Sequence, residues 1–229
     1  MLNRKTGVSK VPYDSLNISY GVGDSPVNVT ENRRKIKKLF GIRFLVSAVQ
    51  VHSDRVYTAR SLTRDIEIQG YDALITSQPG VGLLIQQADC QAILLHDPGH
   101  AAVGAIHCGW RGNVVNIIET TVARMRKEFG TDPTSIRAVI SPSLGPCCGE
   151  FIHFRSKLPR HFQKFSTRPG YFDFRAISRS QLIKAGLLQK NIQVIDICTV
   201  CNSNFFSYRR SQKNGNRVTG RQGSVICLE

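Results

Sequence analysis

A thiol and an imidazole stand at the ends of two apolar runs that a turn separates. Cys90 precedes the run at residues 92–95, and His107 follows the run at residues 101–106. Pro98-Gly99 lies between the runs and is typical of a turn. Because the two ends of an antiparallel hairpin meet at one edge of the sheet, we expect the two side chains to be neighbours. A neighbouring thiol and imidazole can bind a metal ion or form a nucleophile–base pair.

A second imidazole, His52, follows directly on a strand-like run at residues 44–51. Two imidazoles and one thiolate form a good zinc-binding set and leave a fourth position open, as catalytic zinc sites do. A metal ion in such a site lowers the pKa of bound water toward neutrality. His52, Cys90 and His107 are therefore the candidate catalytic and metal-binding residues, against the simpler interpretation that each is structural.

The other cysteines form weaker patterns. Cys198 and Cys201 form a Cys-x-x-Cys motif, which is half of a structural zinc site or a redox pair. No second pair has a similar spacing, and the adjacent Cys147 and Cys148 are not expected to ligate one ion together. We interpret these four as structural thiols. Cys108 lies in an apolar run and is assigned to the core.

The elements that position these residues follow from the spacing of apolar and turn residues. The pattern predicts helices at 31–40, capped by Thr30, at 114–129, ended by Gly130, and at 179–185. It predicts strands at 44–51, 72–76, 81–86, 137–141 and 192–197, a final hairpin of 205–209 and 218–228, and a loop at 65–71. The free amide groups at the start of the 114–129 helix, close to Arg111, would favour an anion such as phosphate.

The composition is that of a basic globular protein. The chain has 229 residues, of which 41% are hydrophobic, and a formal net charge of +15. Without a repeat or a linker, we expect one domain over residues 1–229. The densest basic cluster, at 33–38, is interpreted as a solvated helix face and not as a nucleic-acid patch, because few aromatic residues accompany it. An odd count of seven cysteines, no apolar leader and no apolar run of about 18 residues favour a reduced cytoplasmic protein without a membrane span.

Several well-known catalytic motifs are absent. The chain has no Walker loop, no His-Glu-x-x-His motif and no Gly-x-Ser-x-Gly nucleophile elbow. It also lacks the His-x-Glu and Pro-Cys-x-x-Cys pair of the zinc nucleobase deaminases. The candidate metal centre therefore does not belong to any of these classes.

Five ordered motifs resemble one known family over nearly the whole chain. The motifs are Gln50-Val51-His52, Ala88-Asp89-Cys90, His107-Cys108-Gly109-Trp110-Arg111-Gly112, Gly145-Pro146-Cys147-Cys148 and Phe206-Ser207-Tyr208-Arg209-Arg210. They are similar to those of the YfiH-type family, also called the laccase-domain or multi-copper polyphenol oxidoreductase family. The resemblance implies a single-domain layered α/β/β/α sandwich, distantly similar to cysteine hydrolases of the cytotoxic-necrotizing-factor type. It also implies that His52, Cys90 and His107 ligate the metal.

The resemblance further implies an activity. Members of this family are described as zinc-dependent purine nucleoside phosphorylases that act on adenosine, inosine and methylthioadenosine and also deaminate adenosine. The expected partners are thus a small-molecule nucleoside and phosphate, with Arg111 as the first candidate for phosphate binding and Arg4 and Arg209 as weaker ones. The preferred nucleoside and the oligomeric state stay open.

Three other functions compete with this one. A copper-dependent polyphenol oxidase, which the older family description suggests, needs many more ligands than the six histidines of this chain can supply. A metal-free hydrolase would use Cys90 as nucleophile and His107 as base, and would leave His52 without a role. The resemblance links such an activity to peptidoglycan editing, as described for some members of the family. A nucleic-acid-binding module would use the net positive charge and bind in a strongly salt-dependent way.

Overall fold

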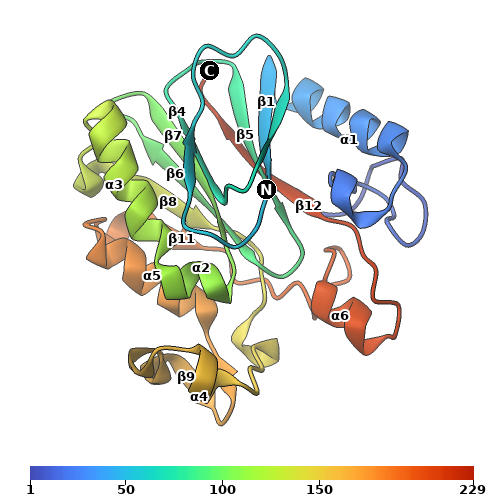
Figure 1. Ribbon diagram of the computed structural model, residues 1–229, viewed down its shortest axis with the longest axis vertical. Coiled ribbons are helices and arrows are strands. Elements are labelled where there is room, and N and C mark those ends of the chain that lie inside the picture. The colour runs from blue at the N-terminus through green and yellow to red at the C-terminus, as the bar shows by residue number, and fades with distance from the viewer.

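Two stacked β-sheets carry helices on both outer faces in the computed structural model, which describes all residues from 1 to 229 (Figure 1). The first sheet has the strand order β12-β5-β1-β3. Its strands are β1 (Phe44–Val49), β3 (Ile66–Gln69), β5 (Val81–Gln87) and β12 (Gln222–Cys227). β1 runs parallel to both β3 and β5, whereas β12 is antiparallel to β5.

The second sheet contains six strands in the order β11-β8-β6-β7-β4-β2. They are β2 (Val56–Thr58), β4 (Ala73–Thr76), β6 (Gln91–Asp97), β7 (Ala102–Cys108), β8 (Arg137–Ile140) and β11 (Ile192–Val194). β6 and β7 form the expected antiparallel hairpin, in which Ala92 lies opposite His107. Cys90 and His107 therefore meet at the same end of this hairpin, as the sequence predicts.

Apolar residues form three layers: one between the two sheets, and one between each sheet and the helices that cover it. The residues between the sheets come from both of them and include Val46, Leu83, Leu94 and Ala105. The long runs of fully buried residues in β5 and β7 follow from this position, because strands covered on both faces have no side that favours polar residues. The sandwich of α/β/β/α type is thereby confirmed.

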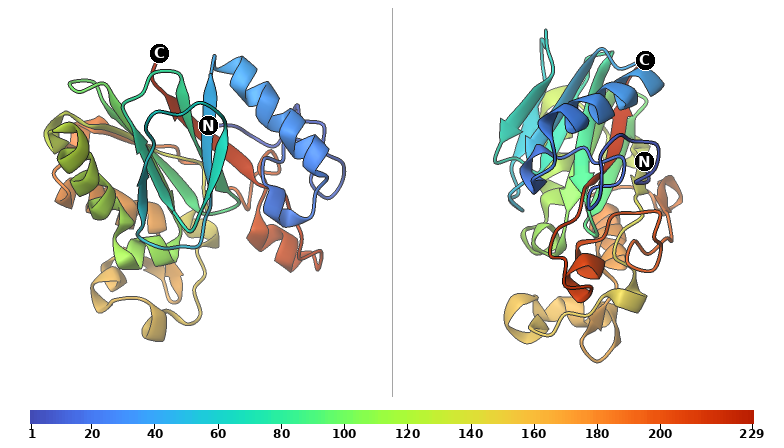
Figure 2. Two further views of the ribbon diagram at one scale, coloured as in Figure 1. Left: turned by 45° about the horizontal axis from the view of Figure 1, so that its top comes forward. Right: turned by 90° about the vertical axis from the view of Figure 1, so that its right-hand side faces the viewer.

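Helices cover the two outer faces. α1 (Pro26–Leu39) packs against the first sheet through Ile36, and α3 (Ile117–Phe129) and α5 (Phe174–Lys184) pack against the second. Figure 2 shows α1 on one side of the sheets and the α3–α5 pair on the other. The shorter elements are η1 (Tyr20–Val22), α2 (Trp110–Val115), η2 (Pro133–Ser135), η3 (Pro146–Cys148), α4 (Phe154–Lys157), η4 (Arg160–Phe165), β9 (Ser166–Arg168), β10 (Tyr171–Phe172), η5 (Gln189–Asn191) and α6 (Tyr208–Lys213).

Two predicted helices have other boundaries in the structure. α1 starts at Pro26 and not at residue 31, because proline fits the first position of a helix, so Thr30 lies inside the helix. The predicted helix at 114–129 is divided in two by Asn116, whose left-handed backbone (φ 54°) ends α2 and begins α3. The first of these pieces starts at Trp110, so Arg111 belongs to the helix and does not precede it.

Three further predictions are wrong. Residues 65–71 contain the edge strand β3, in which Ile66 and Ile68 pack against the core and alternate with the polar Glu67 and Gln69. The predicted hairpin of 205–209 and 218–228 does not form, because Ser207 caps the helix α6 and β12 pairs with β5 instead. α5 begins at Phe174, five positions before the predicted start, since the side chain of Asp173 accepts hydrogen bonds from the amides of Arg175 and Ala176.

The basic residues of α1 have partners within the fold. The guanidinium of Arg33 is buried and contacts Glu67 at 2.8 Å and the Ser47 hydroxyl at 3.0 Å. The ammonium of Lys37 pairs with Asp65 at 2.6 Å. Part of the positive charge at 33–38 is thus used to join α1 to the first sheet. No helix of the protein has both the length and the apolar character that a membrane crossing requires.

Candidate metal centre

The imidazoles of His52 and His107 and the thiol of Cys90 lie together at one end of the sandwich. One ligand atom from each residue can be chosen so that all of them lie within 4.8 Å of one another. Cys90 Sγ is 4.0 Å from Nε2 of His52, and the two imidazole rings meet edge to face with their centroids 4.9 Å apart. A tetrahedral zinc ion would set the sulfur and nitrogen about 3.6 Å apart, so a small contraction suffices.

The three side chains come from three different segments of the chain. His52 follows β1 in a left-handed backbone conformation with φ 63°. Cys90 stands in the short link between β5 and β6, which belong to different sheets, and His107 lies within β7. The site therefore forms where strands of both sheets end, which is a place where backbone conformations outside the regular regions are common.

Asp72, directly before β4, fixes both histidines. Its Oδ1 accepts a hydrogen bond from Nδ1 of His107 at 2.8 Å and from the backbone amide of His52 at 2.9 Å. Its Oδ2 accepts from the amide and hydroxyl of Ser53, at 2.7 and 3.0 Å. Since Nδ1 of His107 is engaged, its Nε2 is left for a metal ion, which is the arrangement of a carboxylate–histidine–metal site.

Asp72, Cys90 and His107 stabilise one another's charged forms. Burial alone would raise the pKa of Asp72, but the hydrogen bond and charge of His107, with the amides of Ser53 and His52, lower it to about 2. Burial also opposes ionisation of Cys90, yet the positive charge of His107 outweighs it and lowers the pKa of Cys90 to about 6. Burial lowers the pKa of His107, whereas the Cys90 thiolate and Asp72 raise it to about 9. Without a metal ion, the two side chains form a thiolate–imidazolium pair near neutral pH.

The donor set fits zinc. Zinc in proteins is bound by thiolate and imidazole ligands, and catalytic sites use three of them. The buried Asp72 carboxylate supplies the outer hydrogen bond that such histidines need. The chemistry of the donors thus agrees with one metal ion held by His52, Cys90 and His107.

Gly109 permits the close approach of the site to the next helix. A β-carbon at this position would lie 2.8 Å from Cys90 Sγ and 3.2 Å from Cδ2 of His52. Gly109 is also the N-cap of α2. A glycine at position 109 is therefore a steric requirement of the site.

His52, Cys90 and His107 help to line a cavity of about 650 Å³. This volume is in the range of small-molecule binding sites. Four aromatic side chains line it together with three arginines: Trp110, Phe151, Phe174, Tyr208, Arg111, Arg209 and Arg221. The cavity can thus hold a flat apolar ring and an anion at the same time.

The three predicted phosphate-binding arginines occupy different positions. Arg111 is exposed and stacks on Trp110, with Cζ 4.8 Å from the ring centroid. Arg209 lines the cavity and donates a hydrogen bond to the carbonyl of Cys148 at 2.9 Å. Arg4 is not among the residues that line the cavity, since its guanidinium pairs with Asp14 at 2.7 Å and stacks on Phe206.

The remaining cysteines separate into two groups. Cys108 is fully buried and packs in the core beneath α3, on the opposite face of β7 from His107, and burial raises its pKa to about 12. The expectation that Cys147 and Cys148 could not join the Cys-x-x-Cys motif is wrong, because all four sulfurs lie within 4.8 Å of one another. The chain turns at Pro146–Cys148 so that both thiols face Cys201.

Sequence reasoning missed several residues of the site. Asp72 gave no pattern of its own, because it is 35 positions from His107 and its role arises only when β4 and β7 pair. Phe151, Phe174 and Arg221 reach the cavity from segments whose spacing showed no period or was assigned to a hairpin. A buried acid directly before an apolar strand was the one available indication for Asp72.

The sandwich and its His-Cys-His donor set define a protein of the laccase-domain, or YfiH-type, class. The chain belongs to the family described as multi-copper polyphenol oxidoreductase laccase, whose family model matches residues 1–229.

Related proteins and solved structures agree with this assignment. A purine nucleoside phosphorylase of Bacteroides thetaiotaomicron is 33% identical over 237 residues, covering 95% of this chain and 88% of the relative. The mouse purine nucleoside phosphorylase LACC1 is 32% identical over 92% of this chain and 52% of its own length. The crystal structure of YlmD from Geobacillus stearothermophilus superimposes with a TM-score of 0.89 at 30% identity, covering 99% of this chain and 90% of the other.

Proposed function

We propose that this chain is a zinc-dependent purine nucleoside phosphorylase that also deaminates adenosine. The observation that carries the proposal is that His52, Cys90 and His107 lie together in the lining of a cavity that aromatic and arginine side chains also line. The names of the relatives support the first activity, since several of them are called purine nucleoside phosphorylases. The zinc ion, the deamination and the three nucleosides adenosine, inosine and methylthioadenosine belong to the proposal itself.

The aromatic side chains would bind the purine base. Trp110 and Phe151 meet edge to face with centroids 5.0 Å apart, and Phe151 meets Phe174 in the same way at 5.9 Å. Phe151 thus contacts both other rings, and an aromatic face binds a heteroaromatic ring through apolar contact and stacking. The base would thus be held against this wall, inside the cavity that His52, Cys90 and His107 also line.

Arg111 and Arg209 would bind the phosphate. In phosphorolysis a phosphate oxygen bonds to the anomeric carbon while the glycosidic carbon–nitrogen bond breaks and the purine leaves. The two guanidinium groups approach the cavity from separate elements, α2 and α6, and bidentate contacts to phosphate are the strongest that arginine makes. They would orient phosphate and offset its charge as it meets the ribose.

For deamination, water replaces the amino group of adenosine, giving inosine and ammonia. A zinc ion bound by His52, Cys90 and His107 supplies Lewis acidity at its open coordination position. Asp72 keeps His107 oriented with its Nδ1 proton directed away from the substrate. The same three ligands would therefore serve both reactions.

A metal-free cysteine hydrolase is the second candidate. The lowered pKa of Cys90 and the raised pKa of His107 favour it, because a thiolate–imidazolium pair is the resting form of many cysteine nucleophiles. His52 lies against this pair without a catalytic duty in such a mechanism. A zinc site gives all three residues a role, so we prefer it.

The test combines metal analysis with product analysis on the full chain. Purified protein is measured for zinc and copper, then incubated with adenosine, inosine or methylthioadenosine, with and without phosphate. We expect the protein to contain zinc. With phosphate present, we expect free base together with ribose 1-phosphate from adenosine and inosine, or methylthioribose 1-phosphate from methylthioadenosine. Without phosphate, we expect only inosine, formed from adenosine. Cys90→Ala and His52→Ala should lose the zinc of this site and both activities, whereas Cys227→Ser, outside the site, should retain them.

Each alternative gives a different result. Ribose 1-phosphate formation by a Cys90→Ala protein that has lost the zinc of this site would refute the role of the metal centre. No turnover of any of the three nucleosides with zinc bound would refute the proposed activity. A hydrolase would keep its activity after chelation and in His52→Ala and lose it on alkylation of Cys90. Oxidation of polyphenols by the copper-loaded protein alone would favour the laccase-like alternative.

A further inference from the structure

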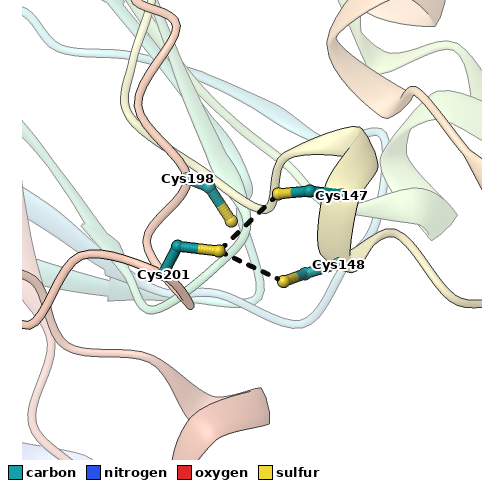
Figure 3. Close-up of side chains that lie close together, drawn as sticks. All are labelled: Cys147, Cys148, Cys198 and Cys201. Atoms are coloured by element: carbon teal, nitrogen blue, oxygen red, sulfur yellow. Dashed lines mark hydrogen bonds between the residues drawn. The ribbon is translucent and has the colours of Figure 1, made fainter.

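Four cysteine side chains form a cluster that the proposed activity does not use. Cys147 and Cys148 belong to η3, and Cys198 and Cys201 lie in the segment after β11. Figure 3 shows the four sulfur atoms directed toward a common centre from these two segments. We refer to these four residues as the four-cysteine cluster. It is distinct from the candidate metal centre, whose thiol is Cys90.

The sulfur–sulfur distances are those of thiolates around one ion. Cys201 Sγ lies 3.7 Å from Cys147 Sγ and 3.5 Å from Cys148 Sγ, and all four sulfurs fit within 4.8 Å. Four thiolates at about 2.3 Å from a tetrahedral zinc ion stand about 3.8 Å apart. A disulfide requires about 2.05 Å, and all seven cysteines of the chain are free.

The backbone of the two segments is joined around the cluster. The amide of Ser143 donates to the carbonyl of Ile197 at 3.2 Å, and the amide of Thr199 donates to the carbonyl of Ser143 at 3.0 Å. The amide of Gly145 donates to Sγ of Cys198 at 3.3 Å. Hydrogen bonds of this kind stabilise a thiolate and orient it, as the outer partners of metal ligands do.

Gly145 is required for this approach. A β-carbon there would lie 2.9 Å from Cβ of Cys198 and 3.3 Å from Sγ of Cys147. Only a residue without a side chain lets the two segments close around the sulfurs.

Positive charge surrounds the cluster. Arg210 donates to the carbonyls of Thr199 and Val200 at 2.6 and 3.0 Å, and Arg209 donates to the carbonyl of Cys148 at 2.9 Å. Arg168 donates to the carbonyl of Cys147 at 3.4 Å. Four thiolates and one divalent cation have a net charge of −2, which these guanidinium groups would offset.

We propose that the four-cysteine cluster binds a second zinc ion, held by Cys147, Cys148, Cys198 and Cys201. Four protein ligands leave no open position, so the site is structural and not catalytic. It would fasten the segment after β8 to the segment after β11. Soft thiolate ligands in a tetrahedral set favour zinc over harder ions such as magnesium.

The second ion would act on the cavity through Asp89. The hydroxyl of Thr199 donates to Oδ1 of Asp89 at 2.7 Å, and the amide of Leu144 donates to the Asp89 carbonyl at 2.8 Å. Asp89 precedes Cys90 and has a left-handed backbone with φ 84°. Both segments of the cluster therefore hold the residue that places the Cys90 thiol.

The decisive measurement is the zinc content of variants purified under reducing conditions with zinc supplied. We expect two zinc ions per wild-type chain, one in Cys201→Ser and one in His107→Ala, and two in the control Cys227→Ser. The Cys201→Ser protein should also melt several degrees below wild type. The ion missing from His107→Ala should be that of the candidate metal centre. The count at the four-cysteine cluster does not depend on nucleoside turnover, so this proposal and the proposed function can fail separately.

Cobalt provides a second measurement that does not depend on the folding of a cysteine variant. In His107→Ala loaded with cobalt, the remaining ion should show the intense thiolate-to-cobalt charge-transfer absorption and tetrahedral bands of a four-thiolate site. A wild-type chain with a single zinc ion that is lost in His107→Ala would overturn the proposal. So would a non-reduced mass that shows disulfides among these four cysteines in protein purified with zinc.

Discussion

His107 donates a hydrogen bond from Nδ1 to the buried carboxylate of Asp72 at 2.8 Å, and the same carboxylate oxygen accepts from the backbone amide of His52. One acid thus orients two ligands that reach the site from different strands. The imidazole of His107 is fixed in the form that presents Nε2 to the cavity. The geometry of the site therefore depends on a residue outside the three-residue donor set.

Replacing Asp72 with asparagine should weaken zinc binding at the candidate metal centre by roughly 10- to 100-fold. The side-chain NH₂ of the new asparagine would meet hydrogen-bond donors, because Ser53 or the two histidines donate to each oxygen of Asp72. This repulsion between donors would displace both histidines. Competition with a chelator measures the affinity. Asp97→Asn is the matched control, since Asp97 is equally buried and pairs with His100 at the far end of the hairpin. Equal zinc affinity in wild type and Asp72→Asn would contradict the role of Asp72.

The acid stability of the metal-free protein should also depend on Asp72. Its pKa is about 2 in the folded protein, where His107 and the backbone amides outweigh burial, against 3.8 as the usual value. A lowered pKa contributes stability above about pH 4 that is lost as the pH falls through about 2. At neutral pH this contribution is at most about 2 kcal/mol. Thermal melts of wild type and Asp72→Asn should therefore differ most near neutral pH and converge toward pH 2, and a constant difference would exclude this cause.

Gly109→Ala should remove the metal ion without unfolding the protein. The new methyl group would stand 2.8 Å from Cys90 Sγ, a distance that forces the thiol or α2 to move. We expect loss of the zinc of this site and of nucleoside turnover, with a melting temperature close to that of the metal-free wild type. Gly99→Ala, in the turn at the other end of the β6–β7 hairpin, meets only Asp97 Oδ1 at 3.4 Å and serves as control. Full zinc content in Gly109→Ala would show that the site tolerates this displacement.

Arg111→Ala should raise the KM for phosphate by roughly tenfold or more, because a charge-assisted contact is lost. The KM for the nucleoside should change less, since the Trp110–Phe151–Phe174 wall is kept. Initial rates over a range of phosphate concentrations separate the two constants. Arg43→Ala removes an arginine that stacks on Phe44 in a similar way, outside the cavity, and should leave both unchanged. An unaltered KM for phosphate in Arg111→Ala would show that Arg111 does not bind phosphate and would leave Arg209 as the candidate.

The elements with strong local patterns were predictable from the sequence. The hairpin of β6 and β7 has two apolar runs around a Pro-Gly turn, so its pairing placed Cys90 beside His107. α3 was found from its helical spacing, but its start was not, because a left-handed residue such as Asn116 leaves no mark in hydrophobic periodicity. β3 was missed since an edge strand carries polar residues on much of its surface.

The spacing of residues along the sequence could not predict contacts between distant segments. The four-cysteine cluster joins residues more than 50 positions apart, and the parallel pairing of β8 with β11 brings them together. From the sequence, Cys147 and Cys148 were not expected to ligate one ion together, because they are adjacent in the chain. In the 3-10 turn that contains them, both thiols can reach one partner. The mistaken C-terminal hairpin has a similar origin, since Asn214-Gly215 follows a helix instead of joining two strands.

β12 gives the first sheet its last strand, and in Figure 1 it lies beside β5, which leads to Asp89 and Cys90. Gln87 of β5 pairs with Gln222, so a ribosome must add 135 further residues before this edge of β5 can be covered. Until then the nascent chain presents an uncovered apolar strand whose backbone groups could pair with another chain. The protein should accordingly be most dependent on chaperones late in its synthesis, after β5 has emerged and before its final partner has.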